Sequence, residues 1–236
     1  MNPDLASDAV EFGRVVRDAI GSAGGDELAL RAEADPDQRA AFIAPVLTEL
    51  GVWDLRPRAD ADEAEAAAAV CRSAGWWGAA YPVAERLARP LDVDVDGLVV
   101  VSDARPSAVV ADLTDLRWLA VGLDGHRHVA KPQPMTDSVR KIGFVAPLTL
   151  DHLDDAGEPD LALALRLAAI EAADVVFRIT HQLHGAIGFC DETTLSWISR
   201  ASQSLRRVPF GLSATRDALA RRIRSHGLSG LFGPRP

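Results

Sequence analysis

Apolar residues recur at helical spacing through the first ninety positions of the chain. They repeat every three or four residues over Leu28–Ala34 and Arg39–Leu50, and Gly51 is placed to end the second of these helices. The Ala- and Glu-rich stretch Asp62–Ala74 predicts a third helix, ended by Gly75. The pattern therefore predicts a helical N-terminal part.

A group of large aromatic residues follows the third helix. Trp76, Trp77 and Tyr81 lie close together beside Pro82. Clustered aromatic side chains bury much apolar area, so we expect them to pack in the core rather than to bind a ligand.

The spacing of apolar residues changes between positions 97 and 145. The runs "GLVVVSD", "SAVVADL", "RWLAVGLDGHRHVAK" and "KIGFVAPL" are short, β-branched and separated by turn residues. Asp124-Gly125 predicts a hairpin, because glycine tolerates the positive φ of a tight turn. The sequence predicts a small antiparallel sheet here.

Helical spacing returns after "LDDAGEP", which we interpret as a loop. Leu161–His181 is expected to form one long helix with Asp160 as its N-cap. It is apolar around most of its circumference, so we expect it to be buried in a helix bundle or a subunit interface. Asp174 and Arg178 have the i,i+4 spacing of an ion pair. The polar positions form a narrow stripe made of Arg166, Asp174, Arg178 and His181.

Two shorter helices are predicted at the C-terminal end, over Glu192–Arg207 and Ser213–His226, with Ser213 as the N-cap of the second. The fold class is therefore mainly α with a small antiparallel β-domain. We divide the chain into an N-terminal helical domain (residues 1–91), a reduced middle β-domain (92–150) and a C-terminal helical domain (151–236).

Composition narrows the range of functions. The chain has 236 residues, 48% of them hydrophobic, and a net charge of −9, which indicates a globular protein and disfavours nucleic acid as a partner. The most apolar run, Leu161–Ile170, is too short to span a bilayer. With no signal-peptide pattern and only Cys71 and Cys190, we expect a cytoplasmic location and no disulfide. The hydrolase, P-loop and Rossmann motifs are absent from the sequence.

Positive charge is concentrated near the C-terminus. From Trp197 onward the sequence contains eight arginines, one aspartate and no lysine, so this part carries about +7. It indicates either a site for a phosphate-bearing molecule or an acidic partner, or simply a solvated helix face.

Candidate chemistry lies at two places, the predicted strand after Gly125 and the end of the long helix. His126 and His128 share one strand face, but no third ligand is in view, so we predict no metal site. In "HQLHGAIGF", Gln182 and His184 offer hydrogen-bond donors at the end of the long helix. The glycines of this stretch favour close approach of a ligand, but a glycine after a helix is also an ordinary cap.

The segment "HQLHGAIGFCDETTLSWISRASQSLRR" resembles the C-terminal signature of the acyl-CoA dehydrogenase family. In that family a buried helix leads into Q-x-H-G-G-x-G-F, a turn that binds the ADP half of an FAD lodged mainly in a neighbouring subunit. Phe189 completes the match, and Ala186 replaces the second glycine. "LTELGVWDL" and "AAAVCRSAGWWGAAYPVAERLA" are similar to the family's N-terminal helices. The resemblance implies these cofactor-binding residues: Gln182, Leu183, His184, Gly185, Ala186, Gly188 and Arg200.

The chain also departs from the family. It lacks the strand that lies against the flavin ring and several helices before the Q-x-H-G turn. Phe210 stands where the family's catalytic glutamate would be, and phenylalanine cannot abstract a proton. Glu171 and Asp174 are the nearest carboxylates, and we expect them to balance the arginines of their helix. The resemblance therefore implies no catalytic residue in this chain.

The function implied is that of a small, non-catalytic subunit that completes the FAD site of a larger acyl-CoA dehydrogenase subunit. Some members, including those that act on steroid side-chain thioesters, assemble from two unlike chains, so an α2β2 hetero-oligomer is expected, with acyl-CoA bound through the partner. Two alternatives are a purely structural subunit and a stand-alone module that binds CoA or a nucleotide.

Overall fold

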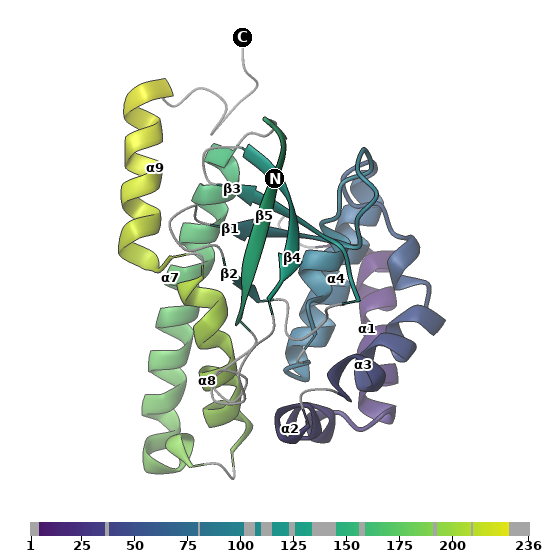
Figure 1. Ribbon diagram of the computed structural model, residues 1–236. Coiled ribbons are helices and arrows are strands. Elements are labelled where there is room, and N and C mark those ends of the chain that lie inside the picture. The colour runs from purple at the N-terminus through teal and green to yellow at the C-terminus, as the bar shows by residue number, and fades with distance from the viewer. Residues whose placement is uncertain are drawn as a thin grey trace.

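The protein consists of two groups of helices with a small sheet between them, as the computed structural model in Figure 1 shows. The prediction of a mainly helical chain with a small sheet is confirmed. The structure describes residues 5–35, 38–79, 81–101, 107–109, 115–122, 126–133, 145–155, 159–190, 193–208 and 210–226.

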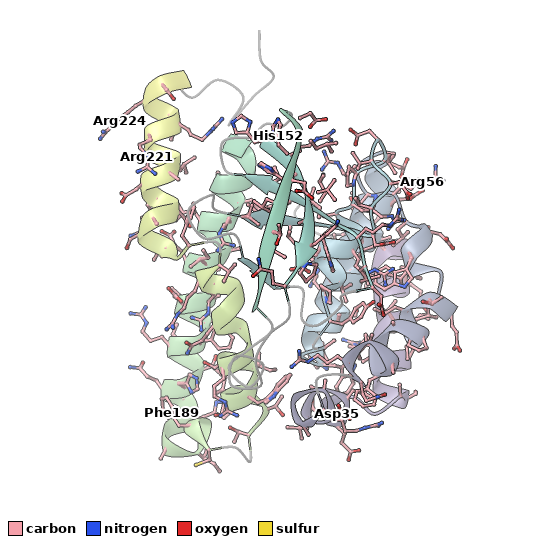
Figure 2. The ribbon with its side chains drawn as sticks, viewed as in Figure 1. Asp35, Arg56, His152, Phe189, Arg221 and Arg224 are labelled. Carbon is pink, nitrogen blue, oxygen red and sulfur yellow. The ribbon has the colours of Figure 1, made fainter. Side chains whose placement is uncertain are left out.

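The two groups of helices meet at one end of the molecule. Asp35 and Phe189, one from each group, mark this end in Figure 2. Here Thr194 Oγ1 donates a hydrogen bond to Asp26 at 3.3 Å. Trp197 packs so closely on Gly78 that a Cβ there would lie 2.1 Å from its ring. The C-terminal helices are thus attached to the N-terminal ones.

The N-terminal helices form their own core. They are α1 (Ser7–Ser22), α2 (Asp26–Ala34), α3 (Arg39–Glu49), η2 (Val52–Asp54), α4 (Ala61–Trp76) and α5 (Val83–Leu87). Their buried side chains form one cluster: Val16, Ile20, Leu28, Ile43, Leu47, Val52, Ala67, Val70, Ala74, Val83 and Leu87.

Helix α4 shows how its sequence sets both ends. The Asp60 carboxylate caps its first turn by accepting bonds from the backbone of Asp62 and Glu63. The prediction that Gly75 ends the helix is wrong. The helix continues to Trp76, and Gly78 ends it with a φ of +57°, where the backbone bonds of the turn require the left-handed conformation.

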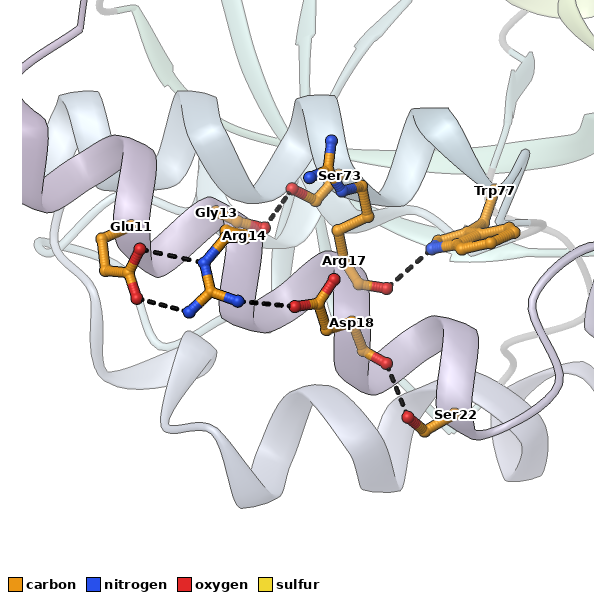
Figure 3. A network of polar contacts seen from close by, with 8 residues as sticks. All are labelled: Glu11, Gly13, Arg14, Arg17, Asp18, Ser22, Ser73 and Trp77. Atoms are coloured by element: carbon orange, nitrogen blue, oxygen red, sulfur yellow. Dashed lines mark hydrogen bonds and ion pairs between the residues drawn. The ribbon is translucent and has the colours of Figure 1, made fainter.

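Helices α1 and α4 pack closely because small residues face each other. A Cβ on Gly13 would lie 2.9 Å from the Cβ of Ala69. Ser73 Oγ donates to the carbonyl oxygen of Gly13 at 2.6 Å, and Trp77 Nε1 donates to that of Arg17 at 2.7 Å (Figure 3). These bonds satisfy polar groups that the close contact removes from water.

The aromatic cluster was only partly predicted. Trp77 and Tyr81 pack against the N-terminal core as expected. Trp76 is 64% exposed, with the Arg17 guanidinium 5.2 Å from its ring centroid. On the last turn of α4 it lies at the surface beside Arg17 of α1, so the prediction of core packing is wrong for Trp76.

The middle of the chain forms a five-stranded sheet with the order β1-β3-β4-β5-β2. Its strands are β1 (Gly97–Val101), β2 (Ser107–Val109), β3 (Trp118–Gly122), β4 (His126–Pro132) and β5 (Val145–Asp155). The prediction of an antiparallel sheet is wrong at one edge, because β1 pairs with β3 in parallel. The chain runs from β1 to β2 at the opposite edge before it returns to β3. The antiparallel pairing of β3 with β4 is confirmed, and the Asp124-Gly125 turn lies outside the described residues.

Two arginines fasten the acidic segment before β1 to the sheet. Arg127 on β4 binds Asp92 at 2.7 Å and Asp154 of β5 through two bonds. Arg117 binds Asp94 and Asp96 in the same segment. Hydrogen bonds from Arg127 lower the pKa of Asp92 and of Asp154, so these carboxylates stay ionised. The connection from the N-terminal helices to the sheet is therefore held by ion pairs.

The last strand is longer than expected. Strand β5 extends to Asp155, past residue 150, so the interpretation of "LDDAGEP" as a loop is wrong for its first three residues. Asp154 and Asp155 pair with β4, and Leu153 lies at a shift of the register. The remaining helices are α7 (Pro159–His184), α8 (Thr194–Arg207) and α9 (Leu212–His226), with the short η3 (Gly185–Phe189) after α7.

The long helix was predicted within a few residues, but its N-cap was not. Helix α7 begins at Pro159, which suits a first helical position because its missing N–H costs nothing there. Asp160 therefore lies inside the first turn. Ser213 likewise lies inside α9, which begins at Leu212, and α8 begins two residues after Glu192.

The packing of α7 differs most from expectation. In the described part of α7 the buried hydrophobic residue is Ile170, whereas Leu165 and Leu183 are 71% and 81% exposed. The expectation of a helix buried within a bundle of this chain is wrong. A subunit interface remains the alternative that the pattern predicted.

Candidate cofactor-binding turn

The candidate site begins where α7 ends. His184 is the last residue of the helix, and Gly185 has a φ of +58°, which favours glycine. Gly185 therefore acts as a helix cap, one of the two roles that the sequence allowed. A Cβ built on Gly185 would meet nothing within 4 Å, so open space surrounds this peptide. The cap leaves room for another group to approach.

Gly188 has a different role. It is buried, and a Cβ there would lie 2.9 Å from the Cβ of His184 and 3.3 Å from Leu195. The atoms that approach Gly188 closely therefore belong to this chain and not to a ligand. This glycine lets the turn fold back onto α7 and α8.

The two histidines of the last turn of α7 are both held in place. The His181 ring stacks on Phe189 with centroids 4.4 Å apart. His184 Nδ1 lies 2.9 Å from the carbonyl oxygen of Thr180. A carbonyl oxygen only accepts, so Nδ1 carries the proton in this contact and Nε2 is left as the second polar atom. That nitrogen accepts from a hydroxyl when the ring is neutral and donates to a phosphate when it is protonated.

The outer side of the turn is exposed. Gln182, Leu183, His184, Gly185 and Ala186 all belong to this exposed side. Ile187 and Phe189 are also exposed, and the face therefore combines hydrogen-bonding groups with apolar surface. Dinucleotide sites need both, since the bases pack on apolar groups while the sugars and phosphates require donors.

Arg200 is brought to the turn from α8. Its Nη1 donates to Ser196 Oγ at 2.8 Å, and Ser196 Oγ donates to the carbonyl oxygen of Phe189 at 3.4 Å. Arg206 is held elsewhere, with Nη1 2.7 Å from Asp174 and its guanidinium over the ring of Phe177. Of these two arginines, Arg200 is the one that the structure connects to the turn.

The arginines of α9 are distant from the turn. Figure 2 shows Arg221 and Arg224 pointing outward from α9, at the opposite end of the C-terminal helices from Phe189. Both side chains are exposed. Arg221 and Arg224 therefore lie on a different surface from the turn, whereas Arg200 is connected to it, and the sequence could not distinguish them.

The nearby carboxylates are engaged in ion pairs. Asp174 pairs with Arg206 rather than with Arg178 as its spacing predicted. Glu171 accepts two bonds from Arg216 at its Oε1 atom. Both therefore balance arginines of neighbouring helices. At Phe210, the position that the resemblance assigns to a catalytic base, the backbone oxygen accepts a bond from Arg166.

A third histidine lies near the two that were candidate metal ligands. His152 on β5 is 5.8 Å from His126 and 5.3 Å from His128 between ring centroids. The sequence pattern did not single it out, because His152 lies between the last predicted strand run, "KIGFVAPL", and the loop "LDDAGEP". Even so, among the described residues no three His, Cys, Asp or Glu side chains are arranged to hold a metal ion.

A buried carboxyl group lies outside the turn, on α5. Burial raises the pKa of Glu85 to about 7. Burial, and then the charge of Glu85, raise the pKa of the nearby Cys71 thiol to about 11. Both groups are neutral in weakly acidic solution, so neither acts as a charged ligand or as a ready nucleophile there.

Comparison with models of known protein families, with curated proteins and with solved structures found no match to this chain. Across the described ranges, no helix combines the length and the apolar character needed to cross a membrane.

Proposed function

We propose that this protein is a small, non-catalytic subunit of an FAD-dependent acyl-CoA dehydrogenase, located in the cytoplasm, with the arrangement of N-terminal helices, middle β-domain and C-terminal helical bundle of that family. It completes the FAD site of a larger subunit in an α2β2 assembly. The larger subunit supplies the base and binds the acyl-CoA, which is dehydrogenated between its α and β carbons. Steroid side-chain thioesters are one substrate class that fits this assembly.

One observation carries the proposal. The motif Q-x-H-G ends a long helix in an exposed turn, with open space beside the left-handed Gly185. Gln182 and His184 offer polar groups on that turn, and Arg200 is connected to it from α8. These groups suit the ribose and pyrophosphate of a dinucleotide, which require donors and close backbone approach.

The non-catalytic role follows from the surroundings of the turn. Oxidation of an acyl-CoA by flavin requires a base at the α carbon and the flavin N5 at the β carbon. Glu171 and Asp174 are paired with arginines, and Phe210 offers no carboxylate. The chain therefore contributes cofactor contacts, while a second chain contributes the chemistry.

Half of a dinucleotide site binds weakly, because its few contacts must offset the immobilisation of the whole cofactor. We expect the isolated chain to show no tight FAD binding in a fluorescence titration. Coexpressed with its larger dehydrogenase subunit, it should copurify as a yellow complex with FAD. A yellow isolated chain that oxidises an acyl-CoA unaided would overturn the proposal, as would a flavin content of the complex that does not depend on this chain.

The turn is tested within that complex. His184→Ala and Arg200→Ala should each lower FAD occupancy several-fold, whereas Arg224→Ala, on the distant end of α9, is the matched control and should leave it unchanged.

Gly185→Asn separates the two roles of the glycine. Asparagine tolerates a positive φ, so the fold should persist while its side chain fills the open space and lowers FAD occupancy. Glu171→Gln should leave turnover nearly intact.

A further inference from the structure

One face of α7 is apolar and exposed from Leu165 to Leu183. On a helix with 3.6 residues per turn these side chains fall within about 120° of the circumference and extend over about 27 Å along it. All of them are exposed: Leu165, Ala168, Ala169, Ala172, Val175, Val176, Ile179 and Leu183. We call this surface the α7 face.

The remaining sides of α7 are already in use. Arg166 donates to the backbone oxygens of Val208 and Phe210, between α8 and α9. Asp174 pairs with Arg206 of α8, and Glu171 pairs with Arg216 of α9. These contacts attach α8 and α9 away from the α7 face. No described part of the chain buries the α7 face.

Small and large side chains are separated along the middle of the α7 face. Leu165 lies at its N-terminal end and is followed by the alanines 168, 169 and 172, whereas its C-terminal half carries Val176, Ile179 and Leu183. We infer that a second copy of this chain covers the α7 face, with the two α7 helices antiparallel about a twofold axis level with residue 174.

In that arrangement Ala172 of one copy faces Val176 of the other, and Ala169 faces Ile179. Small residues then receive large ones at these two levels, as close packing requires, and Leu165 of one copy meets Leu183 of the other at each end of the pair. Two parallel helices would instead place alanine against alanine and isoleucine against isoleucine, which leaves gaps at one end and crowds the other. The antiparallel pair is therefore the one that this pattern fits.

Charge supports the same partner. Glu171 and Arg178 lie on one border of the α7 face, and in the antiparallel pair Glu171 of one copy lies within one residue of the level of Arg178 of the other. Both bonds from Arg216 go to Oε1 of Glu171, so its second oxygen remains to accept a bond. A surface that matches itself in both size and charge is what a twofold interface requires.

The inference goes beyond the proposed function and does not depend on it. An α2β2 assembly contains two copies of this chain. The twofold contact would place the two Gly185 turns at opposite ends of the helix pair, about 33 Å apart at 1.5 Å per residue. The contact therefore leaves both turns available to the larger subunits.

The first test is the mass of the isolated full chain in sedimentation equilibrium. We expect a dimer of the 25.2 kDa chain at micromolar concentration. Val176→Glu should raise the dimer dissociation constant at least tenfold. Val10→Glu is the matched control, since Val10 and Val176 are 54% and 57% exposed and Val10 lies on α1, so this variant should remain dimeric. A monomeric wild-type chain, or a dimer that persists in Val176→Glu, overturns the inference.

The second test measures the register and does not place a charge on the α7 face. In a Cys190→Ser background, chains that carry Ala169→Cys are mixed with chains that carry Ile179→Cys. A short bifunctional thiol reagent should join the two kinds of chain and should not join either kind to itself. Ala169→Cys chains that join to themselves would show parallel helices and overturn the inference, because the antiparallel pair separates these two positions by about 15 Å along the helices. The isolated chain could instead be monomeric, with Val176→Glu abolishing its binding to the larger subunit. That result would overturn the inference of a second copy and leave the proposed function in place.

Discussion

The N-terminal helices and α7 use similar apolar spacing with opposite results. Val16, Ile20 and Leu47 are fully buried against one another, whereas the apolar residues of α7 are largely exposed. The difference lies in what surrounds each helix. The N-terminal helices pack their apolar sides into one shared cluster, whereas the ion pairs of α7 draw α8 and α9 to its polar side. Apolar spacing thus predicts that a helix face will be buried, but it does not show whether the same chain or another chain buries it.

The strongest test of this comparison deletes one leucine from each region. Leu47→Ala removes a fully buried side chain, so it should lower the free energy of unfolding by about 2–5 kcal/mol. Leu183→Ala removes a side chain that is 81% exposed and should change the stability of the monomeric chain by less than about 0.5 kcal/mol. Urea denaturation of both variants, measured below the concentration of any association, makes the comparison. Equal losses would mean that α7 is buried within the chain.

A second test uses the carboxyl group enclosed beside the N-terminal core. Glu85 has its pKa raised to about 7 in the folded state from an ordinary value of 4.5, because burial disfavours its charge. Below pH 4.5 the carboxyl is neutral whether the chain is folded or not. Between pH 4.5 and 7 the unfolded chain ionises while the folded one keeps its proton, so stability falls as pH rises.

Glu85→Gln removes this dependence. The variant should match the wild type near pH 4.5 and exceed its stability by about 3 kcal/mol at pH 8, a figure that follows from the shift in pKa. Thermal unfolding at both pH values measures the difference. The control is Glu171→Gln, whose carboxylate is ion-paired and partly exposed, and it should show no such gain at pH 8. An unchanged difference between pH 4.5 and pH 8 would show that Glu85 is solvated.

The smallest expected effect concerns how α8 is attached to α7. Arg206 is largely buried between Asp174 and Phe177, so Arg206→Ala should cost about 1 kcal/mol in free energy of unfolding. Arg224→Ala on the outer side of α9 should cost close to nothing, because its side chain is exposed. Guanidinium unfolding of the two variants side by side tests this. Equal costs would show that the ion pair does not attach α8.

The elements themselves were largely predictable, because each depends on neighbouring residues. The turn at Gly185 is the clearest case, since a helix that ends in glycine adopts the left-handed cap from local geometry alone. The ends of α4 and α9 were missed by one or two residues because several glycines and serines compete there. Which of these residues ends the helix depends on tertiary packing as well as on the conformational preference of each residue.

The amino-acid sequence by itself determined the long helix α7, the short strands and the polar turn that follows α7. These depend on apolar spacing, capping residues and β-branched runs, all of which act over a few positions. The tertiary structure decided the parallel pairing of β1 with β3, the approach of His152 to His126 and the choice of Arg206 as the partner of Asp174. These contacts join residues tens of positions apart, and many partners of equal chemistry compete for each. Only the packing of the whole chain selects among them, and it also leaves the apolar side of α7 open.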